Sequence, residues 1–80
     1  MTLSEGVPGK TYRVECTRLN EKAGRRLEAL GLIHGTRVEV LNKKKRGAMI
    51  FRARGTRLAV GKEISMGIDV KEDEDERTRD

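Results

Sequence analysis

Residues 20–40 read NEKAGRRLEALGLIHGTRVEV and contain, in order, the signals of a helix, its end, a tight turn and a strand. Asn20 predicts an N-cap, because its side chain can accept a hydrogen bond from a free backbone N–H of the first turn. Gly31 predicts the helix end, because the residue after the last turn commonly adopts a left-handed backbone that glycine tolerates best. One apolar stripe with helical spacing lies between these signals: Ala23, Leu27 and Leu30. We therefore predict a helix over residues 20–30.

A turn and a strand follow the helix directly. Residues 33–36, Ile-His-Gly-Thr, fit a type II turn with Gly35 at the corner that requires positive φ. Residues 37–40 then alternate polar and apolar side chains, which is typical of a half-buried strand.

The pattern RLxxLGLxxGxxV over residues 26–38 resembles the signature of the FeoA family. That family usually has proline where this chain has His34, and histidine is compatible with the same turn. The resemblance spans about residues 3–70, close to the size of one small domain. It implies an SH3-like barrel and a small cytoplasmic protein of bacterial ferrous-iron uptake. Because the motif consists of glycines and leucines, it specifies a backbone path rather than an activity.

The rest of the chain reads as short strands joined by glycine turns. Pro8-Gly9 predicts a type II turn, and Gly55-Thr56 predicts a two-residue hairpin turn with glycine first. The predicted strands are residues 10–16, 37–40, 48–54, 57–60 and 68–70, with one helical turn at residues 63–66. This order predicts a mainly-β domain, a small SH3-like barrel in which closure of the sheet removes the exposed edges.

Alternation along the strands predicts which side chains form the core. Tyr12, Val14 and Cys16 share one face of the first strand, so Cys16 is predicted to be a buried structural thiol. The predicted core face of the third strand consists of Met49, Phe51 and Ala53. A single cysteine cannot form an internal disulfide, which suits the cytoplasm. No serine–histidine pair, paired carboxylates or phosphate loop is recognisable, so we expect no catalytic residues and no enzyme activity.

His34 is the only histidine, and it has no cysteine or carboxylate at the spacing that metal ligands require. We therefore interpret it as a turn residue and predict neither a tight metal site nor a cofactor. No apolar run is long enough to span a membrane, and no stretch resembles a signal peptide, so we expect no membrane insertion.

The charge of the chain is unevenly distributed. Of the net charge of +5, the last ten residues contribute −3, from three basic and six acidic residues, which leaves +8 for residues 1–70. We predict a domain over residues 1–70 and a disordered acidic tail over residues 71–80, because the tail contains no apolar residue. A basic domain can meet an acidic protein, nucleic acid or a membrane surface.

Two groups of basic residues are candidates for a partner surface. Lys22 and Arg26 are i,i+4 neighbours on one flank of the predicted helix, where like charges repel by a few tenths of a kcal/mol. A loop between two predicted strands carries four consecutive cations: Lys43, Lys44, Lys45 and Arg46. Solvation of an exposed charged surface is the alternative interpretation of both groups.

Two functions from different classes remain open. The FeoA resemblance implies an accessory protein that interacts with the cytosolic GTP-binding part of the FeoB transporter. The alternative is a nucleic-acid-binding barrel of SH3-like or OB-like type, which the basic charge supports. Against it, Tyr12 and Phe51 are the only aromatic residues and both are predicted to face inward, whereas base stacking needs exposed aromatic rings. We therefore expect no nucleic-acid partner.

Overall fold

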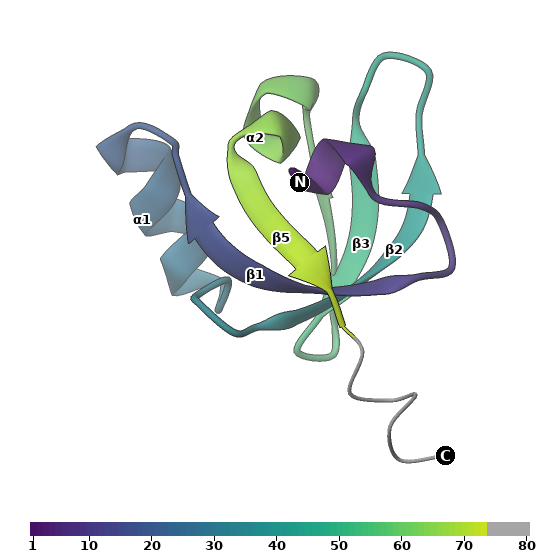
Figure 1. Cartoon of the computed structure of the whole chain (residues 1–80). Helices are drawn as coiled ribbons and strands as arrows, with labels where there is room; N and C mark the ends of the chain where they lie inside the picture. The colour runs from purple at the N-terminus through teal and green to yellow at the C-terminus, as the bar shows by residue number, and fades with distance from the viewer. Residues whose placement is uncertain (74–80) are drawn as a thin grey trace.

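The computed structural model describes residues 1–73, which form short strands interrupted by two helices (Figure 1). In chain order the elements are the 3-10 helix η1 (Leu3–Glu5), β1 (Thr11–Thr17), α1 (Glu21–Ala29), β2 (Arg37–Lys43), β3 (Met49–Ala53), β4 (Thr56–Val60), α2 (Lys62–Met66) and β5 (Ile68–Glu72). The prediction of a mainly-β domain with five short strands and a helix after the first is confirmed.

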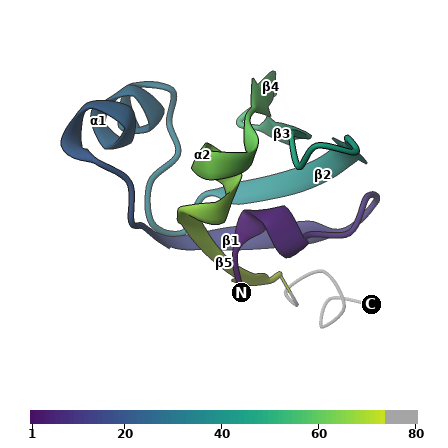
Figure 2. The same cartoon turned by 90° about the horizontal axis from the view of Figure 1, so that it is seen from above.

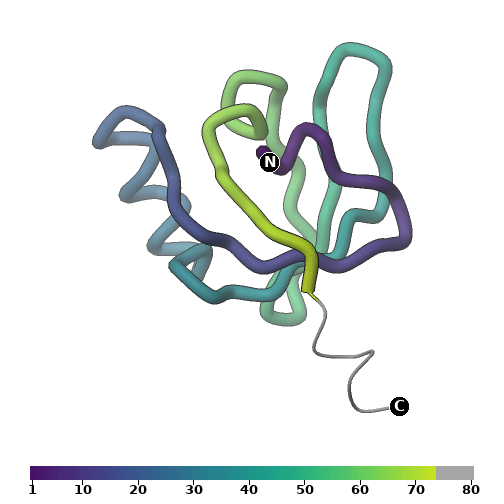
Figure 3. The backbone as a smooth tube through the Cα atoms, viewed as in Figure 1, coloured from purple at the N-terminus to yellow at the C-terminus, as the bar shows by residue number. Residues whose placement is uncertain are grey.

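All five strands belong to one antiparallel sheet with the order β4-β3-β2-β1-β5. The sheet curls around the core, and η1 lies beside α2 and β5 (Figures 1 and 3). The predicted closure of the sheet is wrong, because β4 and β5 are its two ends and the pairing described for residues 1–73 does not join them. The outer side of β5 is covered instead by the N-terminus, where Thr2 bridges to Asp69.

The core consists of apolar side chains from every strand except β4, together with η1, α1 and the segment that follows α1. The buried apolar residues are Leu3, Tyr12, Val14, Leu27, Leu32, Val38, Val40, Met49, Phe51, Ala53, Ile68 and Val70. Leu58 and Val60 of β4 are half-buried against this cluster. The hydroxyl of Tyr12 accepts a hydrogen bond of 2.8 Å from the backbone N–H of Val7, so the buried phenol has a polar partner.

Helix α1 begins and ends as its sequence predicts. The Asn20 side chain accepts from the N–H of Ala23 at 2.8 Å. At the other end, Gly31 has φ of 95° and the N–H of Leu32 donates to the carbonyl of Leu27 at 2.9 Å, which is the Schellman arrangement. Leu30 differs from the prediction: it is the C-cap residue and its side chain is exposed.

The predicted turn at residues 33–36 is confirmed by a hydrogen bond of 3.0 Å from the N–H of Thr36 to the carbonyl of Ile33 and by φ of 88° at Gly35. Gly9 has φ of 93°, as its predicted turn requires. The Thr36 hydroxyl donates to the carbonyl of Gly31 at 2.9 Å, so this turn is fastened to the end of α1.

The turn between β3 and β4 lies one residue earlier than predicted. Ala53 pairs with Thr56, so Arg54 and Gly55 are the two turn residues, with φ of 54° and 79°. Two successive positive φ values define a type I′ turn, whose twist matches the flanking strands. The prediction of Gly55-Thr56 is wrong because the observed register aligns Phe51 with Leu58 on the core side.

A bulge in β1 reverses the predicted direction of Cys16. Val14 pairs with Val70 and Cys16 pairs with Asp69, so two steps along β1 match one step along β5. An extra residue in one strand moves the following side chains to the other face. Cys16 is therefore exposed, and the prediction of a buried thiol is wrong.

The end of the domain lies beyond the predicted boundary at residue 70. Strand β5 continues through Glu72, and Asp73 is buried. The predicted tail is therefore wrong for residues 71–73, because Lys71 and Glu72 pair with β1 and Asp73 is held by arginines of β1 and β2. The rest of the predicted tail, residues 74–80, lies outside the described residues.

Candidate interaction surfaces

The exposed flank of α1 carries the first group of basic residues. Lys22 and Arg26 are both exposed, and neither has an ion pair within residues 1–73. Arg25, on the neighbouring side, pairs with Glu21 as the i,i+4 spacing predicts. The cation pair named from the sequence is therefore available to a partner.

The end of β2 and the loop that follows it present the second group of basic residues. All four are exposed, and the described part of the chain gives them no acidic partner: Lys43, Lys44, Lys45 and Arg46. The loop is closed by a hydrogen bond of 2.8 Å from the N–H of Lys44 to the carbonyl of Ala48. Helix α2 supports it, because the Ser65 hydroxyl donates to the carbonyl of Gly47 at 3.3 Å. Hydrogen bonds within the loop and from α2 thus hold the segment that carries these charges.

The two basic groups do not form one surface. Figures 1 and 2 both place α1 on one side of the molecule and the β2–β3 loop on the other. A compact partner domain would contact one of them, whereas an elongated partner could reach both.

A cleft of about 790 Å³ lies at the ends of β2, β3 and β5, and no motif in the sequence predicts it. Its lining includes Arg37, Arg54 and Asp73. Arg37 Nε lies 3.0 Å from one carboxylate oxygen of Asp73, and Arg13 Nε lies 3.3 Å from the other. Asp73 has only 1% of its side chain exposed, so this carboxylate ties the end of β5 to β1 and β2. Nothing in the acidic run that contains Asp73 distinguishes it from its neighbours in the sequence.

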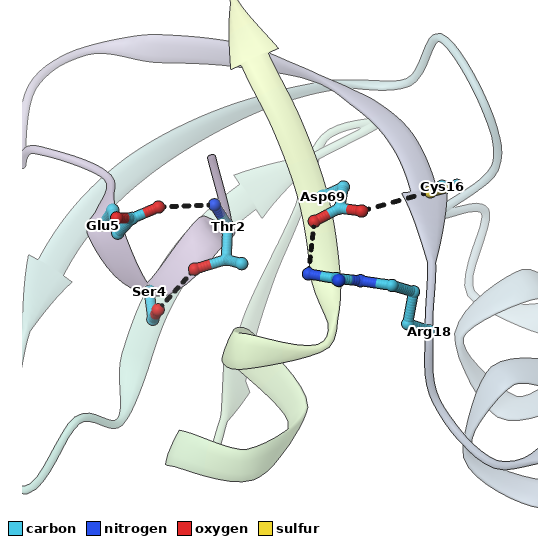
Figure 4. A network of polar contacts seen from close by, with 6 residues as sticks. All are labelled: Thr2, Ser4, Glu5, Cys16, Arg18 and Asp69. Carbon is cyan, nitrogen blue, oxygen red and sulfur yellow. Dashed lines mark hydrogen bonds and ion pairs between the residues drawn. The ribbon is translucent and has the colours of Figure 1, made fainter.

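Cys16 belongs to a surface network with Asp69 and Arg18 (Figure 4). The Cys16 thiol donates to Asp69 at 3.3 Å, and Arg18 Nη2 donates to the other oxygen of the same carboxylate at 2.9 Å. The hydrogen bond to Asp69 raises the pKa of Cys16, desolvation and the Asp69 charge add to this, and the charge of Arg18 opposes it. A raised pKa keeps the thiol protonated and makes it a weak nucleophile near neutral pH.

We expect the pH midpoint of Cys16 alkylation by iodoacetamide to lie above that of an unstructured cysteine peptide, because only the thiolate reacts. Asp69→Asn removes the raising charge and should lower the midpoint. Arg18→Gln removes the positive charge that lowers the pKa of Cys16, so this variant should raise the pH midpoint. Midpoints that are equal in all three proteins would show that the network does not control the thiol.

His34 is exposed in its turn, and among residues 1–73 there is no cluster of three or more histidine, cysteine, aspartate or glutamate side chains that could hold a metal ion. Neither helix of the described part is long and apolar enough to cross a bilayer.

The fold and most of the chain match known proteins. FeoA from Chlorobium tepidum is 29% identical over 90% of this chain and 70% of its own, with a TM-score of 0.84. A crystal structure of an iron uptake regulatory protein, FeoA, is 30% identical over 89% of this chain and 95% of its own, with a TM-score of 0.81. Stenotrophomonas maltophilia FeoA, solved with zinc and described as a prokaryotic SH3 domain protein, is 28% identical over 89% of each chain, with a TM-score of 0.78.

The SH3-like fold predicted from the sequence is thus confirmed. Among curated proteins none matches the chain. The family model for the FeoA domain matches residues 1–72, which include the signature at residues 26–38 and reach the end of β5. The chain therefore belongs to the FeoA family.

Proposed function

We propose that this protein is a cytoplasmic accessory protein of ferrous-iron uptake that binds the cytosolic GTP-binding part of a FeoB-type transporter and is not itself an enzyme. Membership of the FeoA family supports the accessory role. The Stenotrophomonas maltophilia relative is described as a candidate activating factor of bacterial ferrous-iron transport, which also favours a binding role over catalysis.

The observation that carries the proposal is the pair of basic surfaces that have no acidic partner among residues 1–73. Lys22 and Arg26 stand exposed on α1, and residues 43–46 stand exposed at the end of β2 and in the loop that follows it. Exposed cations of this kind contribute little to folding, whereas several of them together accelerate association with an acidic protein and make it dependent on salt. We infer that the partner presents acidic residues to one or both surfaces.

Charge reversal on either surface tests this proposal. Lys22→Glu with Arg26→Glu, and separately Lys44→Glu with Lys45→Glu, should weaken binding to the purified transporter fragment by about tenfold or more, because like charges then face each other. The two double variants are compared because the surfaces lie on different sides of the molecule: loss of binding in both indicates an elongated partner, and loss in one identifies the surface that a compact partner contacts. Both should melt at the temperature of the parent protein, since the changed side chains are exposed.

The nucleic-acid alternative gives a different result in the same assay. Binding to a mixed-sequence duplex would fall steeply with salt, by about one unit of logarithmic slope per phosphate contact. Tight, salt-sensitive binding of the duplex without binding of the transporter fragment would reject the proposed function. The burial of Tyr12 and Phe51 removes the only two aromatic rings from any stacking surface.

A further inference from the structure

Strand β4 has no neighbour on its outer side within residues 1–73. It is the last strand in the sheet order, and its five residues pair with β3 without a bulge. The other end of the sheet is protected, because Thr2 bridges to Asp69 of β5 and the N–H of Val70 donates to the carbonyl of Met1 at 2.8 Å. Figure 2 shows β4 at the border of the molecule, beyond β3. Within residues 1–73 the sheet thus has one edge that is covered at residues 69–70 and one edge, β4, that pairs with no further strand.

The register identifies the backbone groups that point outward from β4. In a two-residue hairpin the pair flanking the turn, here Ala53 and Thr56, exchanges both backbone hydrogen bonds. Antiparallel pairs alternate, so Arg57 and Ala59 occupy the positions that do not bond to β3. Their N–H and C=O groups therefore face away from the sheet, and such a row is a template for an added strand.

The charges along this edge indicate what kind of strand fits. Arg57 lies directly across from Arg52, and like charges in that position repel. Arg52 Nη1 lies 3.3 Å from a carboxylate oxygen of Glu39, whereas Arg57 is exposed and has no acidic partner in the described part of the chain. An acidic side chain across from Arg57 on an added strand would give this arginine an ion-pair partner.

The side chain of Arg54, in the turn that leads into β4, does not run along this edge. Arg54 is the one non-glycine residue with positive φ among residues 1–73, in a turn position that normally takes asparagine or glycine. Its exposed side chain runs over Gly31 and lines the cleft, with no acidic partner among the described residues. The lining of the cleft includes residues of β2 and β3 and none of β4, so Arg54 serves as a control for the charge of Arg57.

We propose that the outer edge of β4 binds an extended, acidic segment of a protein partner by β-strand addition, with one carboxylate across from Arg57. The backbone of the segment would bond to Arg57 and Ala59 and supply affinity, and its acidic side chains would supply specificity. The inference rests on the proposed function only in taking the transporter as that partner. The surface is distinct from the basic flank of α1 and from the β2–β3 loop.

Amide hydrogen exchange tests strand addition directly. The probe is a synthetic nine-residue peptide of alternating valine and glutamate, and a peptide of alternating valine and lysine is its control. We expect the acidic peptide to slow exchange at the Arg57 and Ala59 amides by about tenfold or more, because both become hydrogen-bonded. The Leu58 amide already bonds to β3 and should change little. The basic peptide should leave all three amides unchanged.

Variants separate the contribution of the backbone to peptide binding from the contribution of the charges. Arg57→Glu should weaken binding of the acidic peptide by about tenfold. Arg54→Gly is the matched arginine control: it relieves the strained φ and should leave the affinity for the peptide unchanged, because the Arg54 side chain lies over Gly31. Ala59→Pro removes one outward N–H and leaves the bonds to β3 in place. Lys22→Glu on α1 should leave the peptide affinity unchanged.

The same exchange measurement with the transporter fragment distinguishes the two proposals. If the fragment binds but the Arg57 and Ala59 amides still exchange rapidly, the β4 inference is wrong and the proposed function stands. If the fragment does not bind but the acidic peptide protects both amides, the β4 edge stands and the proposed partner is wrong. Absence of protection by the acidic peptide overturns the inference. So does protection of the two amides that rises with protein concentration alone, because the occupant would then be a second copy of the chain.

Discussion

Replacing Gly31 with alanine is expected to lower the free energy of unfolding by about 1–2 kcal/mol. Gly31 has φ of 95°, a backbone conformation in which an alanine Cβ is strained. The same Cβ would lie 2.4 Å from Cδ of Arg54, so the arginine side chain must also move. In a domain of this size about 1 kcal/mol corresponds to a shift of about 4–8 °C in the melting temperature, which thermal unfolding measures readily.

Gly24→Ala is the matched control. Gly24 lies inside α1 at a helical backbone conformation, and a Cβ added there meets nothing within 4 Å. Alanine forms helices better than glycine by about 0.8–1.0 kcal/mol, so this variant should be more stable than the parent protein. Changes in the free energy of unfolding with opposite signs, at two glycines only seven positions apart, would establish that Gly31 is needed to end the helix. A melting temperature unchanged by Gly31→Ala would contradict that role.

The local signals around α1 were sufficient to predict its structure because each one acts through neighbouring residues. The Asn20 cap, the Gly31 stop and the Gly35 turn each depend on hydrogen bonds within a few positions of the chain. The alternation of Met49, Phe51 and Ala53 was equally informative, since these side chains follow the strand period without interruption.

The errors arose where a contact distant in sequence determines the conformation. The bulge that turns Cys16 outward is defined by pairing with Asp69, more than fifty positions away. The turn at Arg54 and Gly55 is set by the alignment of core residues on β3 and β4, which outweighs the usual preference for asparagine or glycine at the first turn position.

The candidate surfaces were predictable only as lists of residues. The sequence identified Lys22, Arg26 and residues 43–46 as basic, and the structure shows that they are exposed but on different sides of the molecule. The open edge of β4 could not be predicted at all, because strand order is a property of the whole sheet. Periodicity describes which face of a strand is buried and carries no information about which strand is last.

Replacing Asp73 with asparagine is expected to lower the free energy of unfolding by about 2 kcal/mol, even though Asp73 lies in an acidic run that looks like a solvated tail. Its side chain is 1% exposed between Arg13 and Arg37, and removal of one partner from a fully buried ion pair costs about 3–5 kcal/mol. The two arginines are 34% and 39% exposed, so water compensates part of that loss.

The neighbouring residue supplies the control for Asp73. Glu72 pairs with Lys10 at 3.7 Å, but the two side chains are 46% and 58% exposed, so Glu72→Gln should change stability by only about 0–1 kcal/mol. Truncation makes the same comparison without a substitution. A chain that ends at Asp73 keeps the contacts with Arg13 and Arg37. A chain that ends at Val70 loses these contacts together with the last residue pairs between β5 and β1. Equal melting temperatures for the two truncated chains would show that Asp73 does not stabilise the sheet. A lower melting temperature for the shorter chain would place the boundary of the stable domain after Asp73, because a solvated tail contributes nothing to folding.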